Sequence, residues 1–169
     1  MAQGKIATCL WFGDGRAREA AEFYASVFPD SHVGTRFRAT TDYPDGKEGD
    51  ELTVEFTVLG MPFMGLNGGP RFSFSEAVSF QVFTDTQEET DRYWDALTGN
   101  GGTESRCGWC KDRFGLSWQV IPRALMQGMA DPDRDAARRV MQAMMGMTRI
   151  DIAAIERARG GPGPGVDGT

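Results

Sequence analysis

The chain repeats one order of secondary structure twice, and this repeat limits the folds that it can adopt. In the first half, an apolar segment at 5–12 precedes an amphipathic helix pattern at 16–28, whose apolar residues follow the i, i+3, i+4, i+7 spacing. Strand-like segments follow near 32–40, 51–58 and 61–66. The first half is therefore predicted to be a βαβββ unit.

The same order returns in the second half of the chain. A strand pattern at 77–83 leads into a helix pattern at 87–98, and strand-like segments follow near 103–110 and at 115–121. A unit of this size buries too little apolar surface to be stable by itself. We therefore expect an α+β fold in which two βαβββ half-repeats form a curved mixed sheet, with further helices at the C-terminus.

A different pattern follows Pro122, which ends the last predicted strand. Asp131-Pro132-Asp133 predicts the start of a helix, and six of the nine methionines lie between residues 126 and 147. Methionine fills irregular apolar gaps, so we expect this segment to make core or dimer contacts. The predicted regions are a first module at 1–70, a second module at 71–122, a C-terminal helical segment at 123–159 and a disordered Gly/Pro-rich tail at 160–169.

Charge and composition narrow the classes of partner and the compartment. The net charge of −6 repels phosphate backbones, which argues against nucleic-acid binding. Apolar runs are too short for a membrane span, and the N-terminus lacks the pattern of a signal peptide. The cysteines are three in number (Cys9, Cys107 and Cys110), and an odd count without secretory features predicts reduced thiols in the cytoplasm.

Several segments, together with the doubled βαβββ order, resemble the vicinal oxygen chelate superfamily, which includes glyoxalase I, extradiol dioxygenases and bleomycin-resistance proteins. The chain is most similar to the PhnB-like branch, whose members are often labelled 3-demethylubiquinone-9 3-methyltransferase. The resemblance implies a glyoxalase-like fold. The segments that carry it are LWFGDGRAREAAEFY (10–24), FPDS (28–31), LTVEF (52–56), LNGGP (66–70), EAVSFQV (76–82), EETDRYWDAL (88–97), CGWCKDRFGLSWQVIP (107–122) and VMQAMM (140–145).

The label of this branch implies a methyl donor, but the sequence does not provide the usual site for one. A nucleotide-type donor commonly binds at a Gly-rich turn between a strand and a helix in a doubly wound sheet. Asn67-Gly68-Gly69-Pro70 is the Gly-rich segment here, and no helix pattern follows it. We therefore expect no methyl-donor site of that type.

The resemblance also implies a four-position metal site, with His and Glu ligands from the first and last strands of each half. In this chain those positions carry Thr8, Asn67, Ser79 or Gln81, and Gln119, none of which is an anion or an imidazole. Neutral amides and hydroxyls are weak ligands for transition metals. The single histidine, His32, is expected to be a surface or capping residue. We predict no metal and no cofactor, and a ligand-binding site formed by Thr8, Phe12, Asn67, Ser79, Gln81, Trp109 and Gln119.

Three other residues are candidates for catalysis without a metal. Cys107 begins a CxxC motif that lacks the second pair required for a zinc site, and the nearby cations Lys111 and Arg113 favour a reactive thiolate. Glu55 lies on the polar face of the strand at 51–58, and Asp112 begins the turn before the last strand. These side chains are the predicted catalytic candidates, although a loop or turn role also fits Cys107 and Asp112.

Three functions remain open at this point. The chain is either a small-molecule-binding protein without catalysis, or a metal-free lyase, isomerase or transferase that uses Cys107, Glu55 or Asp112. In the third alternative it is an interaction dimer with a vestigial pocket, and the methionine-rich segment is the working surface. A homodimer is expected in each case because the half-repeat sheets leave edges to cover, and the halves pair either within one chain or across two.

Overall fold

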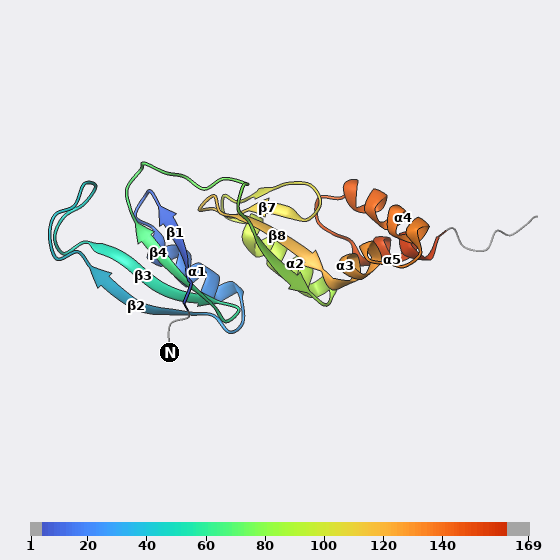
Figure 1. The fold of residues 1–169 in the computed structure, drawn as a ribbon, viewed down its shortest axis with the longest axis horizontal. Helices are drawn as coiled ribbons and strands as arrows, with labels where there is room; N and C mark the ends of the chain where they lie inside the picture. The colour runs from blue at the N-terminus through green and yellow to red at the C-terminus, as the bar shows by residue number, and fades with distance from the viewer. Residues whose placement is uncertain (1–4, 162–169) are drawn as a thin grey trace, which may run out of the picture. The chain divides into compact units, whose positions relative to one another are not determined.

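The computed structural model describes residues 5–161. The chain divides into two compact units, Met1–Phe74 and Ser75–Thr169, and each contains one βαβββ module (Figure 1). The predicted α+β fold with two βαβββ half-repeats is confirmed. The boundary lies at residues 74 and 75, and the C-terminal helices belong to the same compact unit as the second module.

The first sheet has four strands in the order β1-β4-β3-β2. Strand β1 runs parallel to β4, and the other neighbours are antiparallel. Two residues with positive φ, Leu59 and Gly60, close the hairpin between β3 and β4, as a two-residue type I′ turn requires. The elements are β1 (Thr8–Phe12), α1 (Ala17–Val27), β2 (His32–Arg38), β3 (Glu51–Val58) and β4 (Met61–Asn67).

Helix α1 packs closely on this sheet because the residues that it buries there are mostly small. Ala17, Ala20 and Ala21 are fully buried. A Cβ atom at Gly65 of β4 would lie only 2.9 Å from the Ala17 Cβ, so Gly65 allows the close approach. The sheet supplies the volume of this core with the buried aromatic residues Phe12, Phe56 and Phe63.

The second sheet has the order β5-β8-β7-β6 and repeats the pairing of the first, with β5 parallel to β8. Helix α2 begins after Thr86, whose side chain accepts a hydrogen bond from the Glu89 amide at 3.2 Å. Threonine is a favoured N-cap residue because its side-chain oxygen can accept this hydrogen bond. The elements are β5 (Phe80–Thr84), α2 (Gln87–Thr98), β6 (Thr103–Glu104), β7 (Trp109–Lys111) and β8 (Ser117–Pro122).

Three helices follow β8: α3 (Arg123–Met129), α4 (Arg134–Met145) and α5 (Ile152–Gly160). They pack around a buried apolar cluster formed by Ile121, Leu125, Val140, Ile150 and Ile155. The sequence predicted the start of α4, where Asp133 is the N-cap, but it did not predict α3. None of the helices within residues 5–161 is long and apolar enough to span a membrane. Most of the predicted disordered tail lies outside the described residues, although Gly160 is still helical.

Candidate functional site

Each sheet has one face against its helix, and the opposite face is called the far face here. In the second sheet, most of the residues directed toward α2 are apolar and buried, as Val82, Trp118 and Val120 show. The strand registers place Gln81 beside Gln119, and Gln119 beside Trp109, on the far face. Because side chains alternate along a strand, Gln81, Gln119 and Trp109 form one row across β5, β8 and β7. This set is called the polar row.

Hydrogen bonds connect the polar row to the residue before β5. The Gln81 Nε2 group donates to Gln119 Oε1 at 3.2 Å, and Gln119 Nε2 donates to the Ser79 hydroxyl at 2.7 Å. The amide of Gln119 is therefore engaged at both its oxygen and its nitrogen. Within residues 5–161, the Gln81 side-chain oxygen accepts no hydrogen bond, and the Gln81 side chain is exposed. The chain of bonds orients Gln119 and leaves Gln81 able to bind a further polar group.

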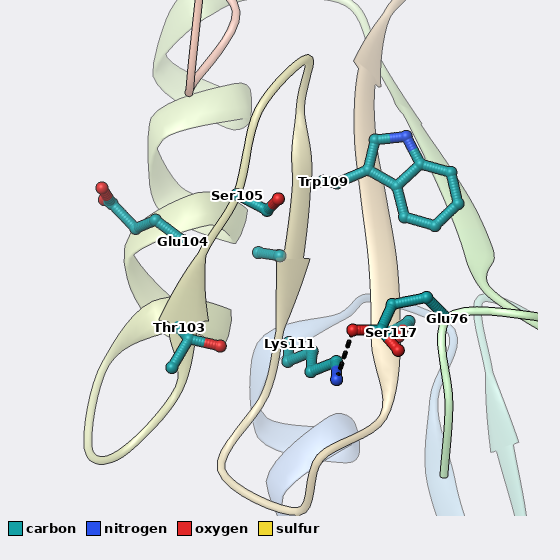
Figure 2. Close-up of a pocket in the computed structure, with 8 residues that line it drawn as sticks. Glu76, Thr103, Glu104, Ser105, Trp109, Lys111 and Ser117 are labelled. Atoms are coloured by element: carbon teal, nitrogen blue, oxygen red, sulfur yellow. Dashed lines mark ion pairs between the residues drawn. The ribbon is translucent and has the colours of Figure 1, made fainter.

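A cavity of about 240 Å³ adjoins the polar row at Trp109. On its lower side in Figure 2, the Lys111 ammonium pairs with the Glu76 carboxylate at 2.6 Å. Lys111 is paired in register with Ser117 of β8, so their side chains project from the same face. The residues that line the cavity are Glu76, Thr103, Glu104, Ser105, Trp109, Cys110, Lys111 and Ser117.

Residues 4–121 match the protein family described as 3-demethylubiquinone-9 3-methyltransferase. A PhnB protein from Bacillus cereus is 33% identical, with a TM-score of 0.62 over 70% of this chain and 99% of its own. Protein PA1353 from Pseudomonas aeruginosa is 23% identical and has a TM-score of 0.52 over 71% of this chain and 98% of its own, which shows a shared fold. No functionally curated protein matches the chain significantly.

The chain belongs to the 3-demethylubiquinone-9 3-methyltransferase family. The predicted membership of the vicinal oxygen chelate superfamily, in its PhnB-like branch, is thereby confirmed.

The methyl donor that the family description implies does not fit these residues. The Gly-rich segment after β4 leads through residues 68–79 without entering a helix. Each sheet also contains antiparallel neighbours, unlike the parallel, doubly wound sheet that commonly holds such a donor. We therefore derive no methyl-transfer step for this chain.

A metal ion of the kind typical of the superfamily does not fit the polar row either. Gln119 occupies the position where the resemblance implies a Glu ligand, and hydrogen bonds to Gln81 and Ser79 already occupy its amide. Within residues 5–161, no group of three or more His, Cys, Asp and Glu side chains is arranged to hold a metal ion. Neutral amides bind transition metals weakly, so metal independence stays a prediction supported by the donor set.

The predicted ligand-binding residues separate into two groups. Ser79, Gln81, Trp109 and Gln119 lie together in the second module, as described above. Thr8 and Phe12 project toward α1, because the register pairs them with Phe63 and Asn67, and Phe12 is only 2% exposed. Thr8 was predicted to bind the ligand, but the register places Cys9 and Trp11 of β1 on the far face instead.

Asn67 also has a structural position in the first module. Its side-chain oxygen accepts a hydrogen bond from the Ala17 amide at 3.0 Å, and its Nδ2 group donates to the Glu51 carbonyl at 2.9 Å. The first bond satisfies a backbone amide at the start of α1, which an isolated helix would leave without a partner. Asn67 thus connects the end of β4 to the start of α1 through a hydrogen bond.

The far face of the first sheet carries a different row of residues. Cys9, Met64 and Glu55 are neighbours across β1, β4 and β3. The predicted candidate Glu55 is in this row, half-buried beside Met64. Cys9 was not among the predicted site residues, although the register places it on the far face. Its thiol is free, and partial burial raises its pKa.

The other two catalytic candidates lie at opposite ends of β7. Asp112 is 2% exposed. Its carboxylate accepts hydrogen bonds from the Phe114 and Leu116 amides at 2.9 and 3.1 Å, and from the Trp118 indole at 2.8 Å. Cys107 has a positive φ of 60° in the turn before β7, where its amide donates to the Met147 carbonyl at 2.8 Å. The Asp112 side chain thus stabilises the turn before β8, whereas the contact of Cys107 is made by its backbone amide.

Sequence reasoning missed Glu76, Lys111 and Ser117 as parts of a site. Ser117 could have been found from the alternation of GLSWQVI, since it lies two residues before Gln119 on the same face. Lys111 required the register of β7 with β8. No local pattern indicates that Glu76, in an irregular segment, reaches Lys111.

Proposed function

We propose that this protein is a metal-independent small-molecule-binding protein whose ligand lies on the far face of the second sheet. Ser79, Gln81, Gln119 and Trp109 form the proposed binding site. The observation that supports it best is the hydrogen-bonded chain from Gln81 through Gln119 to Ser79. A chain of this kind fixes the direction of each amide, and a few fixed polar groups beside an aromatic surface are typical of ligand sites.

The geometry favours a ligand that is flat or apolar on one side and polar on the other. Gln81 offers a side-chain carbonyl oxygen and its second N–H, while the Ser79 hydroxyl hydrogen can be donated. The half-buried Trp109 ring lies next to these groups and offers an apolar surface. A ligand with a hydroxyl or amide group near an unsaturated or apolar portion would satisfy both features.

Ligand-observed NMR with a panel of small polar molecules tests this proposal. We expect compounds that show binding to the wild-type protein to show none to a Gln119→Leu variant, because this substitution removes both side-chain hydrogen bonds of Gln119. Gln142→Leu, at an exposed position on α4, is the matched control and should leave binding unchanged. Binding that persists in Gln119→Leu would show that the ligand lies elsewhere.

We also propose that the protein is a cytoplasmic homodimer. The three cysteines are free thiols, which supports a reducing compartment. Helix α4 exposes Met141 and Met145 one turn apart, and each side chain is 48% exposed. Apolar side chains at this spacing are suited to contact a second copy. Light scattering should give a dimer mass for the wild type and a monomer mass for a Met141→Glu, Met145→Glu double variant, and a wild-type monomer would contradict the proposal.

A further inference from the structure

We propose that the cavity beside the polar row binds the carboxylate group of a small molecule, with Lys111 exchanging its partner from Glu76 to the ligand. The Ser117 hydroxyl would donate a hydrogen bond to the same carboxylate. This inference deepens the proposed function, because it names the charged end of the ligand, and it rests on that function for the position of the ligand's remaining atoms.

The first observation is a buried hydroxyl. Ser117 is 1% exposed, and its Oγ atom has no hydrogen-bond partner among the described residues. Buried polar groups are almost always hydrogen-bonded, so each exception requires an explanation. Ser117 lines the cavity next to Lys111, and a ligand oxygen in the cavity would provide the missing acceptor.

The second observation is the partner that Lys111 already has. Its Nζ atom lies 2.6 Å from the Glu76 carboxylate (Figure 2). The Lys111 side chain is 33% exposed, whereas that of Glu76 is 66% exposed on a segment outside any strand. The hydrogen bond from Lys111 lowers the pKa of Glu76. The Glu76 carboxylate thus marks where an oxyanion is accommodated, and its exposure makes it a replaceable partner.

The remaining lining residues are compatible with one negative charge. Burial raises the pKa of the Cys110 thiol to about 12, so this side chain stays neutral at physiological pH. Glu104 accepts a hydrogen bond from the Trp94 indole at 2.9 Å, and Figure 2 shows its carboxylate directed away from Lys111. Thr103 and Ser105 add hydroxyl groups that can donate or accept.

The same charges favour a carboxylate over a phosphate. Glu104 and Glu76 both line the cavity, and a dianion would be repelled by them more strongly than a monoanion. The volume of about 240 Å³ accommodates a small acid. The expected ligand class is therefore a small monocarboxylate whose other end reaches the polar row.

An NMR titration of the full-length protein with sodium acetate tests the inference. The reporter is the indole N–H signal of Trp109, assigned with a Trp109→Phe variant. Sodium chloride and inorganic phosphate at the same ionic strength are the comparison salts. We expect saturable shifts with acetate and none with chloride. Stronger binding of phosphate than of acetate would overturn the choice of a carboxylate.

Variants identify the groups that bind. Glu76→Gln removes the competing carboxylate and should tighten acetate binding about tenfold, while Ser117→Ala should weaken it by a similar factor. Lys111→Met should abolish binding. Lys47→Met is the matched control, because Lys47 forms an exposed ion pair with Asp42 at 2.9 Å in the first module, and binding should not change.

Two results would overturn the inference: no acetate shift in either the wild type or Glu76→Gln, or equal shifts in Lys111→Met and the wild type. Gln119→Leu separates this inference from the proposed function. We expect it to retain acetate binding and to lose the larger ligands of the polar row. Larger ligands that need Gln119, together with no acetate binding, would leave the proposed function intact and refute only the carboxylate site.

Discussion

Helix α1 buries three alanines and Tyr24, whereas α2 buries Thr90 and the larger residues Tyr93, Trp94 and Leu97. The sheets compensate in the opposite sense. Equivalent registers place Phe12 and Phe56 in the first module where the second module has the smaller buried residues Thr84 and Cys110. The same βαβββ topology can therefore be packed with its larger side chains on either the helix or the sheet, provided that the total core volume is similar.

The far faces of the two sheets differ in chemistry at equivalent positions. The row Cys9, Met64 and Glu55 in the first module corresponds to Gln81, Gln119 and Trp109 in the second. In the second row the Gln81 Nε2 group donates to Gln119 Oε1 at 3.2 Å, whereas the equivalent residues of the first row, Cys9 and Met64, carry a thiol and a thioether. The second module therefore presents an oriented pair of amides where the first module presents two sulfur-containing side chains.

The hairpins before the last strands are also built differently. Leu59 and Gly60 close the first with two positive φ values of 50° and 76°. In the second, the buried carboxylate of Asp112 holds the turn through hydrogen bonds to backbone amides and to Trp118. The second turn therefore combines a side-chain acceptor with the positive-φ residue Gly115, whereas two positive-φ residues close the first.

The largest expected effect follows from removing that side chain. Asp112→Ala leaves two backbone amides and the Trp118 indole without their acceptor, and we expect a loss of about 4 kcal/mol in the free energy of unfolding. Urea denaturation measures it. Asp112→Asn, which keeps one acceptor oxygen, should lose less. A loss below about 1 kcal/mol in Asp112→Ala would show that the turn does not depend on this carboxylate.

The close packing of α1 on its sheet is tested by Gly65→Val, which introduces the residue found at the equivalent position of the second module, Val120. Its Cβ would meet Ala17 at 2.9 Å, and we expect a loss of about 3 kcal/mol in the free energy of unfolding from overpacking. Met64→Val, at the neighbouring far-face position, is the control and should change stability by less than about 1 kcal/mol. Equal effects of the two substitutions would contradict the close packing of α1.

A smaller effect on the free energy of unfolding distinguishes two thiols. Cys110 is buried in the second module, and Cys9 lies on the far face of the first sheet. Burial raises the pKa of Cys110 from 9.0 to about 12, so the unfolded chain ionises first as the pH rises. This thiol therefore costs no stability below pH 9.0, and the free energy of unfolding falls as the pH rises from there toward 12. At pH 10 we expect a loss of about 1.4 kcal/mol in the free energy of unfolding.

Denaturation series between neutral pH and pH 10 measure this dependence. The Cys110→Ala variant should remove most of it, whereas Cys9→Ala should remove less because Cys9 is an exposed residue. An unchanged dependence in Cys110→Ala would assign it to another group.

The smallest effect concerns the first hairpin. Leu59 has a φ of 50°, a conformation that asparagine adopts more readily than leucine. We expect Leu59→Asn to raise the free energy of unfolding by about 0.7 kcal/mol. Leu59→Ala is the control, because it also removes the leucine side chain but does not favour a positive φ as asparagine does. A destabilised Leu59→Asn would show that the partly exposed leucine contributes packing that outweighs the strain.

Much of the fold could be predicted because apolar periodicity is strong in α1, α2, β3 and β8. The short strands β6 and β7 and helix α3 carry too few residues for a periodic signal, so their bounds required the tertiary structure. Helix α4 was found at its N-cap because Asp133 follows a proline and its side chain satisfies a backbone amide.

The candidate site was predictable where it depends on alternation within one strand. Gln81 and Gln119, which the resemblance placed in the site, share the far face as the alternation of their strands requires. Thr8 faces α1, and because β1 is apolar on both faces its sequence does not indicate which face lies against the helix. The roles of Asn67 and Asp112 depend on hydrogen bonds to backbone amides that only the folded chain brings near. The pairing of Lys111 with Glu76 joins segments that no local pattern connects.

The claim that the second module binds its ligand with amides and hydroxyls instead of a metal is tested most directly by calorimetry. The metal-free protein would be titrated with Zn²⁺, Ni²⁺ and Mn²⁺ in separate experiments, with Gln119→Leu beside the wild type. We predict no saturable heat for any of the three ions, because Gln119 is engaged by Gln81 and Ser79. Binding of one equivalent by the wild type that is lost in Gln119→Leu would contradict the account.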